Sequence, residues 1–170
     1  MKFKYYRFVL IFSMMVLSGL SHQAFSQDLG KYEALYIYNF TKYIKFPGNG
    51  ENLTIGAMGD GSIHDELDKM VKMKGDGKLV YKKLNSVNDI SGCDIIFIGK
   101  SEDRNLASIL EKTQGKSVLV IAENEVSAQH GAAISFYMDG DKLKFIINKG
   151  VIDTKKMQVS SSLMTLAKVI

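Results

Sequence analysis

The run Asp94-Ile95-Ile96-Phe97-Ile98-Gly99 is almost entirely apolar, and Ser117-Val118-Leu119-Val120-Ile121-Ala122 repeats that composition further along the chain. Uninterrupted apolar runs of this length are typical of strands that are covered on both faces of a sheet. Between them, Leu106 and Ile109 recur at helical spacing within a helix expected over 103–113. Strand, helix and strand in this order favour a parallel α/β sheet.

The alternation continues toward the amino terminus. We expect a strand over 53–58, a helix over 62–72 and another strand over 79–83. Ser62 and Asp65 support the start of this helix, because a cap residue and an acidic side chain both favour the exposed N–H groups of a first turn. The middle of the chain is therefore predicted to be an α/β unit.

Toward the carboxyl terminus the pattern becomes antiparallel. Strands are expected over 133–138 and 143–148, and Asp139-Gly140-Asp141 between them strongly predicts a hairpin. The serines at 160–162 lead into a last helix. We therefore predict one α/β domain, with a mixed, mostly parallel sheet flanked by helices and a C-terminal antiparallel hairpin.

A helix rich in aromatic residues is expected before the first strand, over 32–46, and Phe46-Pro47-Gly48 should stop it. Its apolar residues recur at spacings of three and four: Tyr32, Leu35, Tyr36, Phe40, Tyr43 and Ile44. The aromatic residues spread too far around a helix to be buried on one stripe. We expect Phe40 in the core, Asn39 hydrogen-bonded to a neighbouring loop or strand, and aromatic surface near Tyr38 or Tyr43 left for a partner.

The first residues of the chain predict export. A positively charged start is followed by an apolar stretch over 8–20 and by the small-x-small cleavage site Ala24-Phe25-Ser26. The apolar stretch is shorter than the roughly 20 residues that a membrane-spanning helix needs. We expect 1–26 to be a cleaved signal peptide and 27–170 to be the exported domain, located in the periplasm.

The charge of the exported part does not favour nucleic acid as a partner. Three of the 22 basic residues and none of the 18 acidic residues lie in 1–26, which leaves 19 against 18. Arg104 is the only arginine that remains, whereas proteins that bind phosphate backbones usually use several. Cys93 is the only cysteine, so no internal disulfide can form, and its position beside an apolar run predicts an inert, partly buried thiol.

A glycine-rich turn over 56–62, which contains Gly59 and Gly61, links the first strand to a helix. Backbone N–H groups in such a turn can hold an anion or a small ligand, although a plain tight turn has the same composition. The glycine spacing differs from that of a dinucleotide site, and Tyr81 stands where such a site has an acid.

No catalytic or metal-binding set is complete. His64 and Asp68, four residues apart, begin a metal site without completing it, and a surface histidine is the simpler interpretation. The serines at 160–162 fit a helix cap better than a nucleophile, and Glu123 and Glu125 are expected to be solvated. We therefore predict no catalytic residues, no cofactor and no metal, and expect that the protein is not an enzyme.

The stretch Tyr36-Ile37-Tyr38-Asn39-Phe40-Thr41-Lys42-Tyr43-Ile44-Lys45-Phe46-Pro47 resembles the opening signature of the YfiR-like family of exported proteins. Further motifs resemble those of the family in the same order: Ile55-Gly56-Ala57-Met58-Gly59, Cys93-Asp94-Ile95-Ile96-Phe97-Ile98, Gly131-Ala132-Ala133-Ile134-Ser135-Phe136, Phe145-Ile146-Ile147-Asn148 and Ser160-Ser161-Ser162-Leu163. The resemblance covers essentially the whole exported part of the chain.

The resemblance implies an α/β regulatory domain without catalytic activity. It implies repression of a membrane-bound diguanylate cyclase by contact with its periplasmic part, which affects cyclic-di-GMP signalling and biofilm formation. Family members that use paired cysteines have a partner for the cysteine that matches Cys93, and this chain has none, so disulfide switching is not expected.

An alternative is a periplasmic module that binds a small molecule and reports to a histidine kinase, and a homodimer also stays open. The surface expected to meet the partner or ligand comprises Tyr38, Asn39, Tyr43, Phe46, Gly59 and Gly61.

Overall fold

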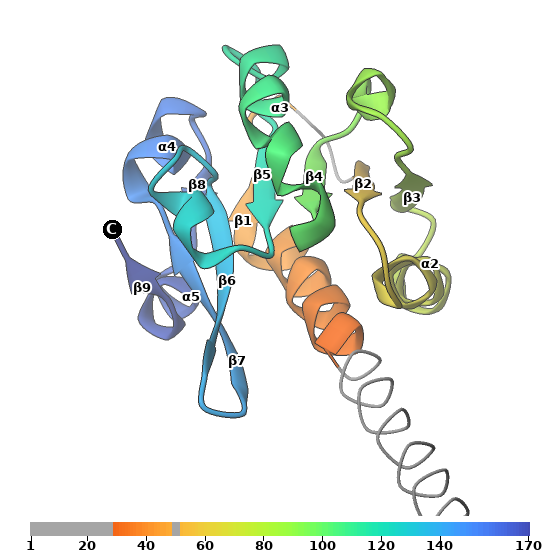
Figure 1. Ribbon diagram of the computed structural model, residues 1–170, viewed down its shortest axis with the longest axis horizontal. Helices are drawn as coiled ribbons and strands as arrows, with labels where there is room; N and C mark the ends of the chain where they lie inside the picture. Colours follow the sequence, from red (N-terminus) through yellow and green to blue (C-terminus); the bar gives the residue numbers. More distant parts are fainter. Residues whose placement is uncertain (1–28, 49–51) are drawn as a thin grey trace, which may run out of the picture.

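The computed structural model describes residues 29–48 and 52–170, and their strands form one seven-stranded mixed sheet beside a two-stranded one (Figure 1). The strands of the large sheet are β2 (Leu53–Met58), β3 (Leu79–Lys83), β4 (Ile95–Ile98), β5 (Leu119–Ala122), β6 (Ile134–Asp139), β7 (Lys142–Ile147) and β9 (Lys168–Val169). They lie in the order β3-β2-β4-β5-β6-β7-β9. The expected signal peptide, 1–26, lies outside the described residues.

Pairing within the large sheet is parallel from β3 through β6. β7 is antiparallel to β6, with Asp139 opposite Lys142 at the turn, and β9 then pairs in parallel with β7. The predicted fold class, a single α/β domain with a mostly parallel mixed sheet and an antiparallel hairpin, is confirmed.

Helices cover both faces of this sheet. One helix occupies 29–43 and is called the aromatic helix below. The others are α2 (Ile63–Lys74), α3 (Leu106–Lys112), α4 (Lys149–Thr154) and α5 (Ser161–Leu166), with the short 3-10 helices η1 (Val87–Ile90), η2 (Lys100–Asn105) and η3 (Glu125–Ala128). The aromatic helix, α2, α4 and α5 share a first core with one face of the sheet, whereas α3 and η1 share a second core with the other.

The aromatic helix ends three residues before the predicted stop. Ile44–Lys45 form a short strand, β1, that pairs with β8 (Gln158–Val159), and the backbone N–H of Ser160 donates to the carbonyl of Tyr43. These partners come from the far end of the chain, so helical spacing alone could not reveal them. β8, like β9 and α4, was not predicted.

The buried side of the aromatic helix also differs from the predicted one. Ala34, Ile37 and Phe40 face the first core, as expected for Phe40. Tyr32 and Leu35 belong to the predicted apolar pattern but are exposed. The pattern therefore identified the helix correctly but not the side on which it is buried.

Candidate functional site

The parallel strands bring three loops together at the carboxyl edge of the sheet. Gly59 follows β2, Gly99 follows β4 and Glu123 follows β5. The first two loops pass so closely that a Cβ on Gly59 would lie 2.9 Å from the Cα of Gly99. β3 and β4 lie on opposite sides of β2, so the strand order reverses its direction there. In open α/β sheets, ligands bind beyond the carboxyl ends of the strands at such a reversal, which is called a topological switch point.

The glycine-rich turn at this edge is held by His64. Its Nε2 lies 2.6 Å from the carbonyl oxygen of Gly59, and its Nδ1 lies 2.6 Å from the hydroxyl of Tyr81 on β3. Burial, with Asp68 and Asp65 nearby, raises the pKa of Tyr81 to about 12, so its hydroxyl stays protonated. His64 is thus half-buried and bonded on both nitrogens, which corrects its interpretation as a simple surface histidine.

Ser62 occupies the N-cap position of α2 but does not cap it with its side chain. Its backbone is in the αR region, with φ −73° and ψ −9°, whereas capping residues are usually extended. Gly61 beside it is exposed and has a φ of +98°, a conformation that favours glycine. The turn therefore depends on backbone geometry and on His64 rather than on a serine cap.

A buried carboxylate reaches the same edge from the aromatic helix. Glu33 is 4% exposed, and its Oε1 has no hydrogen-bond partner among the described residues. Burial, and then the charge of Glu123, raises the pKa of Glu33 to about 8. The start of the helix is pressed against the turn, since a Cβ on Gly30 would lie 2.4 Å from Ser62 Oγ.

Glu33 lines a cavity of about 290 Å³ between the aromatic helix, the loop after β5 and the β6–β7 hairpin. Glu123 lies in its wall, and one of its oxygens accepts a 2.7 Å hydrogen bond from the backbone N–H of Lys100. Phe136 and Leu143 supply apolar wall. The cavity therefore combines two neighbouring carboxylates with an apolar side.

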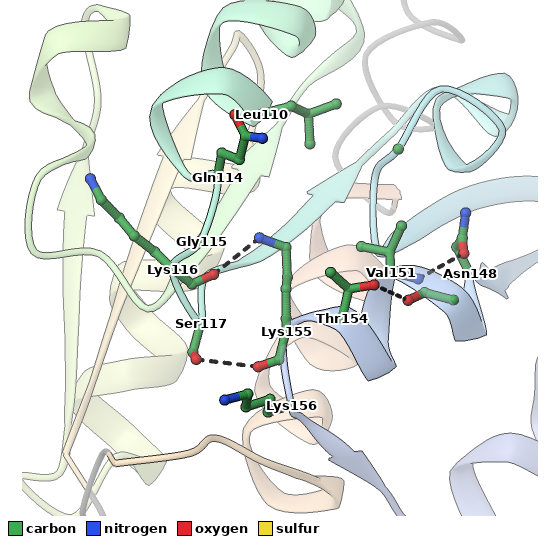
Figure 2. A pocket seen from close by; sticks show the side chains of 12 residues that line it. Leu110, Gln114, Gly115, Lys116, Ser117, Asn148, Val151, Thr154, Lys155 and Lys156 are labelled. Atoms are coloured by element: carbon green, nitrogen blue, oxygen red, sulfur yellow. Dashed lines mark hydrogen bonds between the residues drawn. The ribbon is translucent and has the colours of Figure 1, made fainter.

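A larger cavity, of about 540 Å³, lies at the opposite edge of the sheet, beside α4 (Figure 2). Its polar groups bond to one another: Lys155 Nζ donates to the carbonyl of Lys116 at 3.2 Å, and Ser117 Oγ donates to the carbonyl of Lys155 at 3.2 Å. Burial lowers the pKa of Lys155. These contacts tie the end of α4 to the loop before β5, which is a structural role.

The outward side of the aromatic helix carries a mostly apolar strip, called the outer stripe below, formed by Tyr32, Leu35 and Tyr43 together with the polar Asn39. Tyr32, Leu35 and Tyr43 are 53%, 38% and 45% exposed, and residues spaced by three and four lie on one side of a helix. Asn39 is half-buried, and its side chain has no hydrogen bond to any described residue. The expected tie from Asn39 to a loop or strand is therefore absent from the described part.

Of the two positions near which aromatic surface was predicted, Tyr43 is exposed, whereas Tyr38 is buried and does not belong to the outer stripe. Only 8% of Tyr38 is exposed, because its hydroxyl donates to the carbonyl of Lys74 at the end of α2, and Lys42 Nζ lies 4.5 Å from its ring centre. Phe46 is half-buried against the first core.

The six residues assigned to a partner or ligand surface do not form one patch: Tyr38 and Asn39 lie within the aromatic helix, and the other four lie near its two ends. Gly59 and Gly61 lie at the carboxyl edge, near the start of the aromatic helix, whereas Tyr43 and Phe46 lie at and beyond its end. At about 1.5 Å per residue, the helix separates the two ends by about 21 Å.

Sequence reasoning overlooked Glu33 and treated Glu123 as solvated. Neither belongs to a motif, and only the packing of the helix start against the loop after β5 brings them together. Within 29–48 and 52–170, no group of three or more His, Cys, Asp or Glu side chains is arranged to hold a metal ion. None of the helices in this part is long and apolar enough to cross a membrane.

The sheet and its two helical layers define a single-domain, three-layered α/β protein. A family model described as YfiR/HmsC-like matches residues 30–168, and the chain therefore belongs to this family of periplasmic regulatory proteins. No curated protein matches the chain.

Two solved structures share the fold at low identity. One is described as the ABC domain in complex with L-Trp from Streptococcus pneumonia, with a TM-score of 0.52 and 16% identity over 69% of this chain. The other is a conserved domain protein from Vibrio cholerae O1 biovar eltor, with a TM-score of 0.50 and 14% identity over 82% of this chain. The match spans only 56% and 59% of those two chains, so the likeness concerns the fold alone.

Proposed function

We propose that this protein is an exported regulator that represses a membrane-bound receptor of the diguanylate cyclase type by binding its periplasmic part. Membership of a family of periplasmic regulators supports this proposal. The structural observation that carries it is the outer stripe, because exposed tyrosine and leucine side chains gathered on one helix face are typical of a protein-binding surface. Repression of the cyclase would lower cyclic-di-GMP and limit biofilm formation.

The outer stripe provides the contact surface in this proposal. Asn39 and Tyr43, both assigned to the partner surface from the sequence, belong to it, and Tyr32 and Leu35 join them. Tyr38 contributes indirectly, by fixing the helix against α2. In this proposal the Asn39 amide, which makes no side-chain bond to a described residue, bonds to the partner.

Deletion of the gene tests the repressor role. Loss of the protein should raise cellular cyclic-di-GMP, and a copy with its first 26 residues should restore repression. A copy without them should not, because it cannot reach a periplasmic receptor. Restoration by that cytoplasmic form would contradict the proposal, and a changed phosphorelay with constant cyclic-di-GMP would indicate a histidine kinase instead.

Variants of the outer stripe test the contact surface. The double substitution Tyr32→Ala and Leu35→Ala should weaken binding to the receptor's periplasmic domain at least about tenfold, because aromatic anchors commonly dominate interface energies. Met73→Ala is the control, since Met73 is also a large, exposed apolar residue but lies on α2. Equal binding by all three proteins would show that the contact lies elsewhere.

A further inference from the structure

We propose that the cavity beside Glu33 binds a small organic ammonium ion, with the carboxylates of Glu33 and Glu123 as the groups that hold its charge. This proposal concerns binding by the protein alone and does not depend on the receptor or on repression. It therefore goes beyond the proposed function and can succeed or fail separately from it.

Glu33 has an unsatisfied buried oxygen. A buried acceptor without a donor is unfavourable, and buried side-chain oxygens are bonded in the great majority of cases. Oε1 of Glu33 is buried, lacks a partner in the described part of the chain, and belongs to a residue that lines the cavity. Oε1 itself has almost no accessible surface, so the Glu33 carboxyl must rotate toward the cavity before an N–H donor of a bound molecule can satisfy this oxygen.

The charged side chains that line the cavity are mostly negative. The charge of Glu123 disfavours ionisation of Glu33, and Glu125 lines the same cavity, against a single lysine, Lys100. Lys100 makes no ion pair with a described residue, and it is its backbone N–H that contacts Glu123. Two carboxylates at a cavity wall favour a positively charged occupant, since a cation between them removes their mutual repulsion.

The lining of the cavity suits an organic cation better than a metal ion. Metal ions take several protein donors, commonly three or more, and the described residues contain no such group. The cavity instead has an apolar side, formed in part by Phe136 and Leu143. Small-molecule sites combine apolar walls with a few placed polar groups, and a volume near 290 Å³ suits a small amine with a compact hydrocarbon body.

Binding should be coupled to loss of a proton. The pKa of Glu33 is raised to about 8 by burial and by Glu123, so the carboxyl is mostly protonated below that pH. The other ionisable groups facing the cavity are Lys100, Glu125 and Tyr137. An ammonium ion binds the ionised form of Glu33, so affinity should rise roughly tenfold per pH unit up to about pH 8 and then level off.

The test is calorimetric titration of the processed protein, purified from the exported fraction, with cyclohexylamine. Cyclohexanol has the same shape without the charge, and cyclohexanecarboxylate has the opposite charge. Cyclohexylamine should bind with the stated pH dependence, and the other two compounds should bind at least about tenfold more weakly, because they cannot neutralise the two carboxylates.

Two variants assign the effect to the cavity. Glu33→Gln should remove the pH dependence and weaken the binding of cyclohexylamine at least about tenfold at high pH. Glu111→Gln is the matched control: Glu111 is an exposed glutamate on α3, outside this cavity, so its loss should leave binding nearly unchanged. Circular dichroism verifies that both variants are folded.

Several results would overturn the proposal. Equal affinity for cyclohexanol and cyclohexylamine would show that the cavity is merely apolar, and undiminished binding by Glu33→Gln would place the site elsewhere. No binding of either cyclohexylamine or n-butylamine at tens of millimolar above pH 8 would show that the cavity holds no organic cation.

Discussion

Phe40 shows how much of the first core depends on one side chain. It is fully buried, and its ring centre lies 6.2 Å from those of Tyr36 and Phe136 and 5.2 Å from that of Phe145. These contacts join the aromatic helix to β6 and β7. Phe40 is therefore one of the residues that attach this helix to the sheet, together with Ala34 and Ile37.

Phe40→Ala should lower the free energy of unfolding by about 3–5 kcal/mol, because it leaves a cavity among three other rings. Tyr43→Ala, on the exposed side of the same helix, should change it by less than about 0.5 kcal/mol. Urea unfolding followed by circular dichroism measures both. A similar decrease in the free energy of unfolding for both variants would mean that Phe40 is not packed in the core.

Glu33 should make stability depend on pH in an unusual direction. Its pKa is raised from 4.5 to about 8 in the folded protein, so its neutral form is favoured there. The folded state then binds more protons than the unfolded chain between these pH values, and its free energy of unfolding falls as pH rises through this window.

Glu33→Gln should remove this loss and make the variant more stable than the parent at pH 8 by a few kcal/mol. The two proteins should differ least near pH 4, where Glu33 is protonated in both states. Urea unfolding at a series of pH values measures the difference, with Glu125→Gln as the control. Parallel pH profiles for parent and Glu33→Gln would contradict the raised pKa.

The burial of a single residue could be predicted only where its side-chain chemistry and its position in the helix favour the same environment. Phe40 is large, apolar and central in its helix, and it is buried as predicted. Tyr38 looked available for a partner because the aromatic residues spread too far around the helix to be buried on one stripe, but Lys74 at the end of α2 provides a carbonyl for its hydroxyl. Glu33 could not be predicted at all, since nothing in its neighbourhood along the chain distinguishes it from a solvated acid.

At the scale of elements, Asn148 connects two segments that are far apart in the sequence. Its Oδ1 accepts from the backbone N–H of Val151 at 3.0 Å and caps α4, and its Nδ2 donates to the carbonyl of Ala128 in η3 at 2.8 Å. One side chain thus starts a helix and fixes the loop that precedes β6.

Asn148→Ala should cost about 2 kcal/mol, because it removes both the cap and the donor to Ala128. Asn148→Ser should recover about half of this loss, since serine can cap the helix but is too short to reach Ala128. Chemical unfolding of the three proteins tests the order. Equal losses for Ala and Ser would indicate that the cap contributes little.

The strands were easier to predict than the helix ends. β4 and β5 are continuous apolar runs, and an Asp-Gly turn marks the hairpin of β6 and β7, so these signals are local. β1 and β8 are two residues long and exist because each provides the other's hydrogen bonds. α4 has six residues and little helical periodicity, so its start depends on the Asn148 cap.

At the scale of the whole molecule, the two cores share one sheet. Inward side chains of β4 alternate between them, with Ile95 and Phe97 in the first core and Ile96 and Ile98 in the second. Neither core can come apart without exposing strands that support the other. The domain should therefore behave as a single cooperative unit.

Urea unfolding of the protein should accordingly show one transition for both cores. Methyl NMR signals from Ile95 and Ile96 report on opposite faces of the same strand, and circular dichroism reports on the backbone. All three midpoints should coincide. A separate early transition for Ile96 would show that the layer formed by α3 and η1 detaches on its own.

Cys93 gives this sheet a natural chemical reporter. Its thiol is buried against β2, where a Cβ on Gly56 would lie 2.8 Å from the sulfur, and burial raises its pKa. Alkylating reagents attack the exposed thiolate, so iodoacetamide should label the protein only when β2 and the segment before β4 separate. Because the chain has one cysteine, mass spectrometry would count each opening as a single adduct. The rate of labelling can thus be measured on the unaltered protein with and without a bound partner. A slower rate in the complex would show how strongly the partner holds β2 and the segment before β4 together.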